Sequence, residues 1–178
     1  MAQYAFQIRV SNDRNEDLQN ITGEYFVSTT PTACNAGFLC NKGDHMADGG
    51  YKMTTATDGS APLYACNPSN VRRVPVGDNT YAVGVETLGL GIPAGEKDTF
   101  TKLIVDEVYA FTTDNFSTLV TTTNKYATVS NGMLVGTSSQ PTSGDGFYFE
   151  LDAGLGIDTF VAGNFNEFAR YNLVLRYI

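Results

Sequence analysis

The chain has 178 residues, of which 42% are hydrophobic and 17% are charged, and its formal net charge is -8 at pH 7. This length suits one domain that buries about 70% of the surface of its unfolded chain. The acidic balance works against direct binding of nucleic acid, because phosphates attract Lys and Arg, and no apolar run reaches the ~20 residues of a membrane-spanning helix. The polar positions are rich in Thr, Asn, Ser and Gly, which favours strands and turns. We therefore expect a single β-rich domain over residues 1–178 that contacts neither nucleic acid nor a membrane.

The start of the chain alternates polar and apolar residues over 2–10, with Ala5 as the one interruption. A period of two is typical of a strand with one buried face, and it differs from the continuous apolar block of a signal peptide. We therefore predict a first strand here and expect the protein to be made in the cytoplasm without secretion. The polar run over 12–20 predicts a loop, and aromatic and β-branched residues predict a second strand at 24–29.

Short apolar runs follow between residues 31 and 70. They lie at 37–40, 51–57 and 62–66, and turn-type residues separate them at Gly43-Asp44, at 48–50 and at Asp58-Gly59. Asp-Gly pairs supply the positive φ values that tight hairpin turns require. This spacing predicts a meander or a small barrel of antiparallel strands.

The segment 71–74 lies between Pro68 and Pro75 and contains Arg72 and Arg73. We interpret it as a connection whose two arginines form a solvated edge rather than an anion site. A strand is predicted at 81–87, and a tight connection at 88–95, where Pro93 and several glycines exclude a helix.

Residues 100–111 read as one long strand until the acidic pair Asp106-Glu107 interrupts the apolar faces. We interpret this pair as a bend between two strands, 99–105 and 108–112, rather than as a buried acidic pair. A short helix at 115–120 capped by Asp114 is a further expectation. The Thr and Asn tract at 121–124 is the stretch closest to a linker, which leaves open a subdivision into 1–120 and 125–178.

The last third predicts strands at 126–129, 133–137 and 147–151, a turn at 144–146, and a final strand at 169–177 with one apolar face. The two ends of the chain are therefore both strands with one apolar side, and their pairing would close a sheet. Similar segments at 35–40 and 130–135 leave open a duplicated unit. The expected fold class is all-β, a small barrel or sandwich of short antiparallel strands with long loops and little helix.

The residue types needed for catalysis are sparse. His45 is the one histidine, and no serine or cysteine lies in a recognisable nucleophile motif. Cys34, Cys40 and Cys66 are an odd number without the density of a disulfide scaffold, which fits a reducing compartment and packed apolar roles. Together with His45 they make a nominal Cys3His set, but its spacing lacks the close cysteine pair of zinc motifs. We predict no catalytic residue, no metal and no cofactor, and whether these four side chains meet in space stays open.

Three other patterns resemble catalytic or ligand-binding motifs but lack a required residue or spacing. Glu150-Leu151-Asp152 matches the start of a glycosidase E-x-D-x-x-E pattern, but Leu155 stands at the third acidic position. Gly89-Leu90-Gly91 lacks the spacing of a phosphate loop, and the aspartates 44, 48 and 58 lack a calcium-loop pattern. The carboxylates at 86, 96, 98, 106 and 107 are interpreted as a solvated face. We therefore expect a protein that is not an enzyme.

Tyr51, Tyr126 and Tyr148 stand among polar neighbours, as exposed aromatic residues do in sugar-binding surfaces. A carbohydrate-binding β-sandwich is therefore an alternative function, although ordinary strand packing explains the same rings.

One stretch of the chain resembles a known family. The order of Tyr81 to Gly84, Glu86-Thr87-Leu88-Gly89-Leu90, Ile92-Pro93-Ala94-Gly95 and the run Lys102 to Phe111 is similar to head decoration, or capsid cement, proteins of tailed phages. The segments 34–40 and 61–66 resemble the paired early strands of the same family. The likeness covers roughly residues 30–137 and leaves out the strands at both ends of the chain.

This resemblance implies a virion protein without a catalytic cycle. Such a protein sits on the outside of an assembled capsid, binds the major capsid protein and clamps adjoining shell subunits, and it self-associates as a trimer or other small oligomer. Many modest contacts suffice for this role, because simultaneous engagement raises the effective affinity. A tail or fibre component of a virion is an alternative within the same class.

Overall fold

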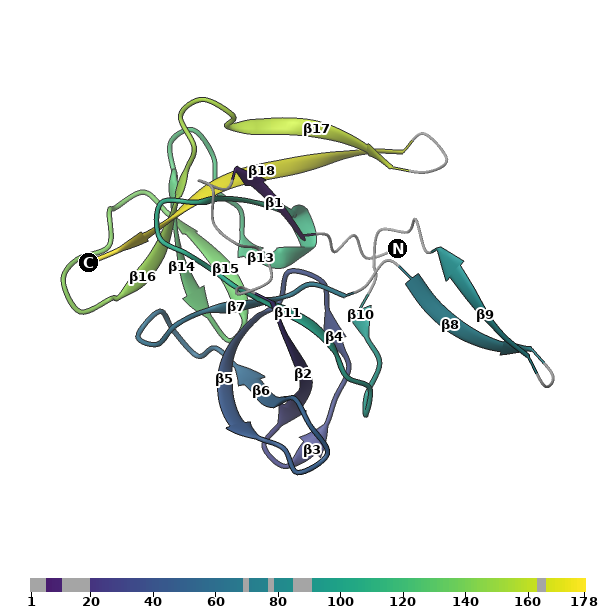
Figure 1. Cartoon of the computed structure of the whole chain (residues 1–178). Helices are drawn as coiled ribbons and strands as arrows, with labels where there is room; N and C mark the ends of the chain where they lie inside the picture. Colours follow the sequence, from purple (N-terminus) through teal and green to yellow (C-terminus); the bar gives the residue numbers. More distant parts are fainter. Residues whose placement is uncertain (1–5, 11–19, 69–70, 77–78, 85–90, 163–165) are drawn as a thin grey trace.

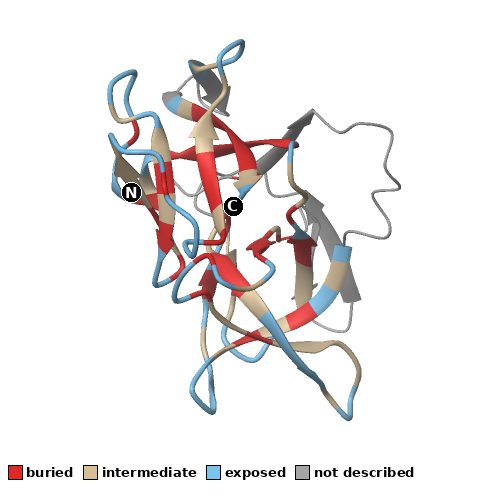
Figure 2. Ribbon diagram, turned by 90° about the vertical axis from the view of Figure 1, so that its left-hand side faces the viewer, coloured by how far each residue is buried: buried red, intermediate tan, exposed pale blue. Residues whose placement is uncertain are grey.

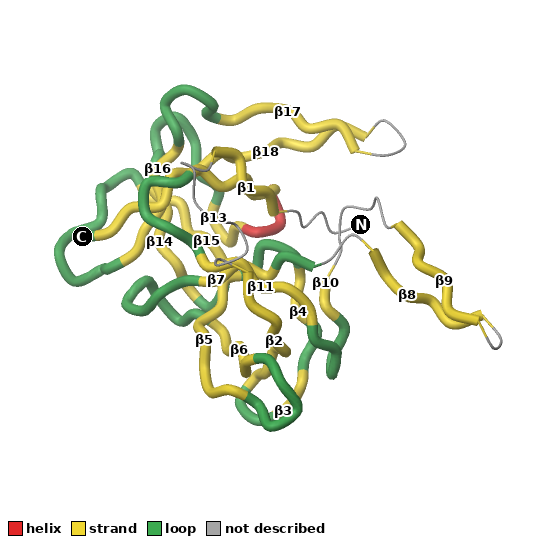
Figure 3. The backbone as a smooth tube through the Cα atoms, in the orientation of Figure 1, coloured by secondary structure: helices red, strands yellow, loops and turns green. Residues whose placement is uncertain are grey.

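The computed structural model describes residues 6–10, 20–68, 71–76, 79–84, 91–162 and 166–178. Over these residues the chain is built from strands, turns and loops, and the one helical piece among them is the short 3-10 turn η2 (Thr113–Asn115) (Figure 3). A small closed barrel lies beside a larger curled sheet (Figure 1). The expected all-β class is therefore confirmed.

The barrel is formed from strands of the first two-thirds of the chain. These strands are β2 (Asn20–Val27), β3 (Thr30–Pro31), β5 (Leu39–His45), β6 (Tyr51–Thr55), β7 (Tyr64–Cys66) and β11 (Asp98–Lys102). Their order is β11-β7-β5-β6-β2, and β2 pairs back onto β11 to close the ring, while β3 extends β2 as a hairpin. The pairing of β2 with β6 is parallel, which differs from the antiparallel meander that the turn spacing predicts.

Of two turns predicted in the barrel, the one at 48–50 is confirmed and the one at Gly43-Asp44 is wrong. Gly49 and Gly50 both have positive φ in the turn after β5, and Met46 N donates to Gly50 O at 2.9 Å. Gly43, predicted as part of a turn with Asp44, lies inside β5, where the register with β6 shifts between Lys42 and His45. The physical reason is a bulge: a Cβ at Gly43 would lie 2.9 Å from Lys52 O, so the glycine allows the close approach of β6.

The larger sheet contains β1 (Phe6–Val10), β12 (Val108–Thr112), β13 (Phe116–Thr118), β14 (Tyr126–Ser130), β15 (Met133–Thr137), β16 (Phe147–Leu151), β17 (Ile157–Ala162) and β18 (Asn166–Tyr177). Its order is β1-β12-β18-β16-β14-β15-β13, and β17 pairs with the first half of β18. The predicted strands at 126–129, 133–137 and 147–151 are confirmed to within one residue. The strand β17 was not predicted.

The two ends of the chain share this sheet without pairing directly. Phe6 on β1 lies opposite Phe111 on β12, and Phe111 in turn lies opposite Tyr171 on β18. The expectation that the first and last strands pair is therefore wrong, because β12 lies between them. Its residues are buried on both faces, which makes β12 the more favourable neighbour for each terminal strand.

The predicted helix at 115–120 is also wrong. The chain makes the 3-10 turn η2 and then enters β13, which pairs in parallel with β15. Asn115 directs this path, because its Oδ1 accepts hydrogen bonds from Thr112 N and Oγ1 at 3.1 and 3.2 Å while its Nδ2 donates to Ala36 O at 2.8 Å. The following tract closes a turn, in which Thr121 Oγ1 accepts from Asn124 N at 2.9 Å.

The bend at Asp106-Glu107 is confirmed, since Asp106 has a φ of 68° and the chain passes there from the barrel to the sheet. Asp106 N donates to Leu175 O at 2.8 Å, which attaches the bend to β18. The rest of the interpretation needs correction, because the Glu107 side chain is buried although Asp106 is exposed.

Two apolar cores hold the molecule together (Figure 2). One lies inside the barrel and includes Met53 and Phe100. The other lies between the barrel and the larger sheet and combines residues such as Leu63 with Phe149. On β5, Leu39 belongs to the second core and its neighbour Cys40 to the first, so the start of this strand is buried on both faces.

Two small strand pairs complete the fold. β4 (Cys34–Asn35) pairs with β10 (Gly91–Ile92) beside the barrel, and β8 (Val71–Val76) pairs with β9 (Asn79–Gly84). The segment 71–74, predicted as a connection, is therefore a strand. Pro75 is tolerated in β8 because a two-stranded ribbon has two edges. The predicted loop at 12–20 lies outside the described residues except for Asn20. Positions 2–5 of the predicted first strand, 85–87 of the predicted strand at 81–87 and 88–90 of the predicted connection also lie outside them.

Candidate functional site

Three thiols meet at one end of the barrel interior. Cys34 on β4, Cys40 on β5 and Cys66 on β7 are free and buried, none more than 2% exposed. All three belong to the core inside the barrel. Cys66 Sγ donates to Cys34 O at 3.5 Å, and Cys34 Sγ and Cys40 Sγ donate to Asn35 O and Phe38 O, each at 3.9 Å. The interpretation of these cysteines as packed side chains is confirmed, although their mutual contact was not predicted.

His45 does not join the thiols. It is exposed at the far end of β5, where its ring lies edge-on to Tyr51 with the centroids 5.2 Å apart. The structure thus brings together three of the four nominal Cys3His side chains. Among the described residues, no group of three or more His, Cys, Asp or Glu side chains has an arrangement that could hold a metal ion.

The three thiols differ in acidity. Hydrogen bonds with Cys40 and Cys66 lower the pKa of Cys34 to about 5, against the opposing effect of burial. Burial is the main cause that raises the pKa of both Cys40 and Cys66, and the neighbouring Cys34 adds to it. A thiolate is the nucleophilic form of cysteine, and the lowered pKa favours this form at Cys34 over Cys40 and Cys66.

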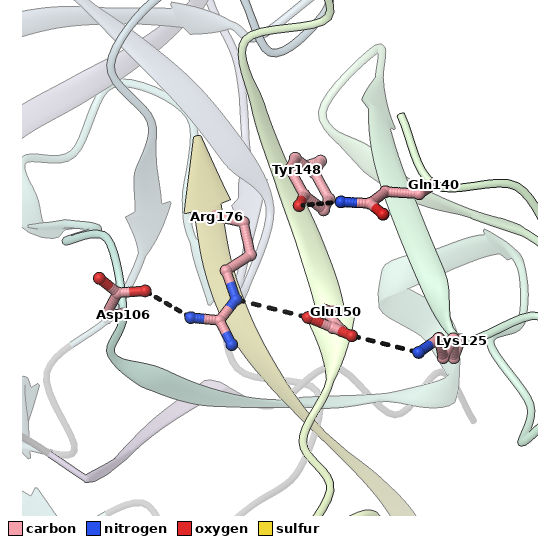
Figure 4. Close-up of polar contacts among 6 residues, drawn as sticks. All are labelled: Asp106, Lys125, Gln140, Tyr148, Glu150 and Arg176. Carbon is pink, nitrogen blue, oxygen red and sulfur yellow. Dashed lines mark hydrogen bonds and ion pairs between the residues drawn. The ribbon is translucent and has the colours of Figure 1, made fainter. Parts of the chain in front are cut away.

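A row of charged side chains crosses the outer face of the larger sheet (Figure 4). Arg176 on β18 lies at its centre and contacts Asp106 through Nη1 and Glu150 on β16 through Nε, the latter at 3.4 Å. Glu150 Oε1 lies 3.4 Å from Lys125 Nζ. Burial opposes the charge of Arg176, but the contacts with both carboxylates outweigh it and raise its pKa.

This charged row joins neighbouring strands on the surface of the sheet. Its members are partly exposed, with 66% exposure for the side chain of Asp106 and 38% for Arg176, and exposed ion pairs contribute at most about 1 kcal/mol each. The row could not be predicted from the sequence, because only the register of β16 against β18 makes Glu150 a diagonal neighbour of Arg176.

A depression of about 310 Å³ lies next to this row. Gln140, on its rim, donates from Nε2 to Tyr148 Oη at 3.2 Å (Figure 4). Other polar side chains of the depression are engaged within the chain: Asp145 Oδ2 accepts from Thr142 N at 2.7 Å, and Thr137 Oγ1 accepts from Ser139 N at 3.3 Å. The lining residues are Thr128, Thr137, Ser139, Gln140, Pro141, Thr142 and Asp145.

The aromatic side chains singled out in the sequence are packed against their own chain. Tyr148 is only 5% exposed, so the expectation of an exposed ring is wrong there. Tyr51 and Tyr126 are half-buried, and the ammonium groups of Lys42 and Lys125 lie over their rings at 4.5 and 5.0 Å from the centroids. These rings do not form one flat surface for a sugar.

The carboxylates of the glycosidase-like pattern have separate structural roles. Glu150 belongs to the charged row, whereas Asp152 Oδ1 accepts hydrogen bonds from Gly154 N and Leu155 N at 2.9 and 2.6 Å and closes a turn. Among the other acidic positions, Glu96 is exposed, and Glu86 lies outside the described residues. The solvated-face interpretation fails at one of them, Glu107.

Glu107 is the buried acid that sequence analysis missed. Its Oε2 accepts a hydrogen bond from Tyr109 Oη at 2.9 Å, and Tyr109 Oη accepts one from Ile104 N at 2.7 Å. Its Oε1 is buried and finds no hydrogen-bond partner among the described atoms. Strand alternation gives no signal for it, because Glu107 lies just before β12 and the five residues of that strand are all buried.

Comparisons of the chain with protein-family models, with curated proteins and with solved structures found no match. The resemblance to phage head decoration proteins therefore stays a prediction.

Proposed function

We propose that the protein is a structural component of a virion that binds the outside of an assembled phage capsid and stabilises it by clamping adjacent shell subunits. The observation that carries this proposal is the shape of the molecule, in which two strand pairs extend beyond the packed barrel and sheet (Figure 1). A compact body with extended ribbons suits simultaneous contact with more than one neighbour.

The first ribbon is the β8–β9 hairpin. Its register runs from Val71 opposite Gly84 to Val76 opposite Asn79, and within the described residues each of its strands pairs only with the other. Isolated two-stranded hairpins are at best marginally stable in water. A ribbon of this kind gains stability when a partner surface covers it or adds a strand.

The second ribbon is formed by β17 and the first half of β18. Ile157 to Ala162 pair with Tyr171 to Asn166, whereas β12 pairs with β18 only as far as Arg170. An ion pair stiffens the base of the ribbon, with Arg170 Nε and Nη2 donating to the two oxygens of Asp158 at 2.7 and 2.6 Å. The strand edges beyond that point suit addition of a strand from a neighbouring subunit.

Clamping needs no strong single contact. Two ribbons on one body engage two sites at once, so the second contact forms at a high effective concentration. Each stable contact is expected to bury about 800 Å² per partner. With a net charge of -8, the chain is expected to meet a shell surface that presents Lys and Arg, because complementary charge speeds association and fixes orientation.

The direct test is quantitative mass spectrometry of purified phage particles whose genome encodes the chain. We expect the protein at a copy number comparable to that of the shell subunit, on heads that lack tails as well as on whole particles. Its absence from particles would overturn the proposal, and its presence only in tail fractions would assign it to the tail instead.

The ribbons can be tested on stripped particles. We expect that replacing residues 71–84 by a short Gly-Ser linker weakens rebinding at least about tenfold, because avidity is lost with one contact. The matched control is Glu96→Gln, an exposed acidic position in the turn before β11. Equal rebinding of both variants would contradict the role of the hairpin.

A further inference from the structure

We propose that Cys34, Cys40 and Cys66 form a reversible dithiol–disulfide site, in which Cys34 attacks a small-molecule disulfide and then pairs with one of its two thiol neighbours. The site lies inside the barrel, remote from the charged row, and the three cysteines come from three different strands.

The arrangement of the strands makes Cys34 the central member. Cys40 on β5 lies opposite Tyr64 on β7, so Cys66 is its diagonal neighbour two residues further along β7. Cys34 on β4 lies in the same buried core as both, and its carbonyl oxygen accepts a hydrogen bond from Cys66 Sγ at 3.5 Å. Thiols packed in one core need only small movements to bring two sulfur atoms to bonding distance, so we expect either neighbour to be able to complete a disulfide with Cys34.

The chemistry balances with the small disulfide as the oxidant. The Cys34 thiolate attacks one sulfur of that disulfide, which forms a mixed disulfide and expels one small thiolate. The expelled thiolate takes the proton of the neighbouring cysteine, whose sulfur then attacks Cys34 and expels the second small thiolate. Two protein thiols become one disulfide, and the small disulfide is reduced to two thiols. The lowered pKa of Cys34 supports its role as the attacking group.

Access to Cys34 depends on the short strand pair that lies beside the barrel. β4 and β10 pair through only two residues each, Gly91 with Asn35 and Ile92 with Cys34. Short pairs of this kind open locally at a lower free energy than the strands of a core. Cys40 and Cys66 lie in strands that are paired within the closed barrel, so opening of β4 exposes Cys34 first.

The disulfide would fasten β4, and with it β10, to the barrel. The reaction needs only the folded chain and a small disulfide, so it does not depend on binding to a capsid. Oxidation is expected to raise the midpoint of thermal unfolding, and reduction with dithiothreitol is expected to reverse the change.

The experiment treats the folded protein with oxidised glutathione at pH 7, quenches the reaction with acid, blocks remaining thiols with N-ethylmaleimide in mildly acidic denaturant, and maps the peptides by mass spectrometry. We expect a loss of about 2 Da before blocking, one alkylated cysteine of the three in the chain, and a bridge that always contains Cys34. Cys40→Ser and Cys66→Ser are each expected to keep one bridge.

Cys34→Ser is the decisive variant, and we expect it to slow bridge formation at least about 100-fold. Cys34→Ala serves as a second variant, and near-ultraviolet circular dichroism checks that both are folded. A Cys40–Cys66 bridge in the folded native chain would overturn the proposal. The proposal would also be overturned if all three thiols reacted only after unfolding in urea. A stable mixed disulfide on Cys34, which neither Cys40 nor Cys66 displaces, would overturn it as well.

Discussion

Substitution of Gly132 by alanine is expected to loosen the attachment of the larger sheet to the barrel. Gly132 lies in the turn between β14 and β15 with a φ of +77°. Its backbone is bonded to the barrel on both sides, because Leu39 N donates to Gly132 O at 2.9 Å and Gly132 N donates to Ala56 O at 2.7 Å. A Cβ at this position would lie 2.1 Å from Cζ of Phe38.

The expected magnitude has two parts. A non-glycine residue in the left-handed region costs about 1 kcal/mol, and forcing an extra carbon into a packed site costs about 1–3 kcal/mol. Phe38 is not free to turn away, because its ring packs edge-on against Tyr25 with the centroids 5.6 Å apart. We therefore expect Gly132→Ala to lower the free energy of unfolding by about 2–4 kcal/mol, which corresponds to roughly 5–15 °C in Tm.

The matched control is Gly95→Ala. Gly95 has almost the same φ, +80°, but a Cβ there would meet no atom within 4 Å, so only the backbone cost of about 1 kcal/mol is expected. Urea unfolding followed by tyrosine fluorescence and circular dichroism measures both variants. Equal losses would refute the contact between Gly132 and Phe38, as would a double-mutant cycle of Gly132→Ala with Phe38→Ala whose coupling is below about 0.5 kcal/mol.

Three further predictions concern polar side chains. Asn115→Ala is expected to lower the free energy of unfolding by about 2–3 kcal/mol in urea titrations, because Ala36 O and Thr112 N lose a buried partner; a loss under about 0.5 kcal/mol would contradict this. Arg170→Lys cannot keep the two-point contact with Asp158, so we expect faster amide exchange in β17 and the first half of β18 but unchanged exchange in β5. The Cys34 thiolate is expected to absorb at 240 nm with a midpoint near pH 5 in the folded chain and near 8.5 in urea. Because the folded pKa is the lower one, the stability contributed by Cys34 is fully present above the unfolded pKa and is lost as the pH falls toward 5; a Cys34→Ser variant whose stability has the same pH dependence as the native chain would disprove it.

Several elements could be predicted because their signals are local. The strands β14, β15 and β16 follow from short runs of apolar and aromatic residues between turn residues, and the turn at Gly49-Gly50 follows from residues that accept positive φ. The bend at Asp106 follows from an acidic pair between two apolar runs. Where a local signal had two readings, the prediction failed, as at Gly43, where glycine marks a bulge instead of a turn.

The candidate site depends on contacts between distant residues. Cys34 and Cys66 are separated by much of the barrel sequence, yet Cys66 Sγ lies 3.5 Å from Cys34 O. From the sequence, Glu107 is interpreted as part of a bend and Tyr109 as part of the next strand. In the structure Tyr109 Oη donates a buried hydrogen bond to Glu107 Oε2. Nothing in the local sequence distinguishes these residues from solvated or simply packed ones.

The sequence by itself therefore determined the all-β class, most strand positions and the absence of any familiar catalytic motif, because these depend on side-chain period and turn residues within a few positions. The tertiary structure decided which strands pair, that β12 separates the two terminal strands, and that three thiols meet in the barrel. The physical reason is that backbone hydrogen bonds can join any two strands. Which two strands pair is settled by burial of particular faces, as for β5, whose adjacent residues Leu39 and Cys40 belong to different cores.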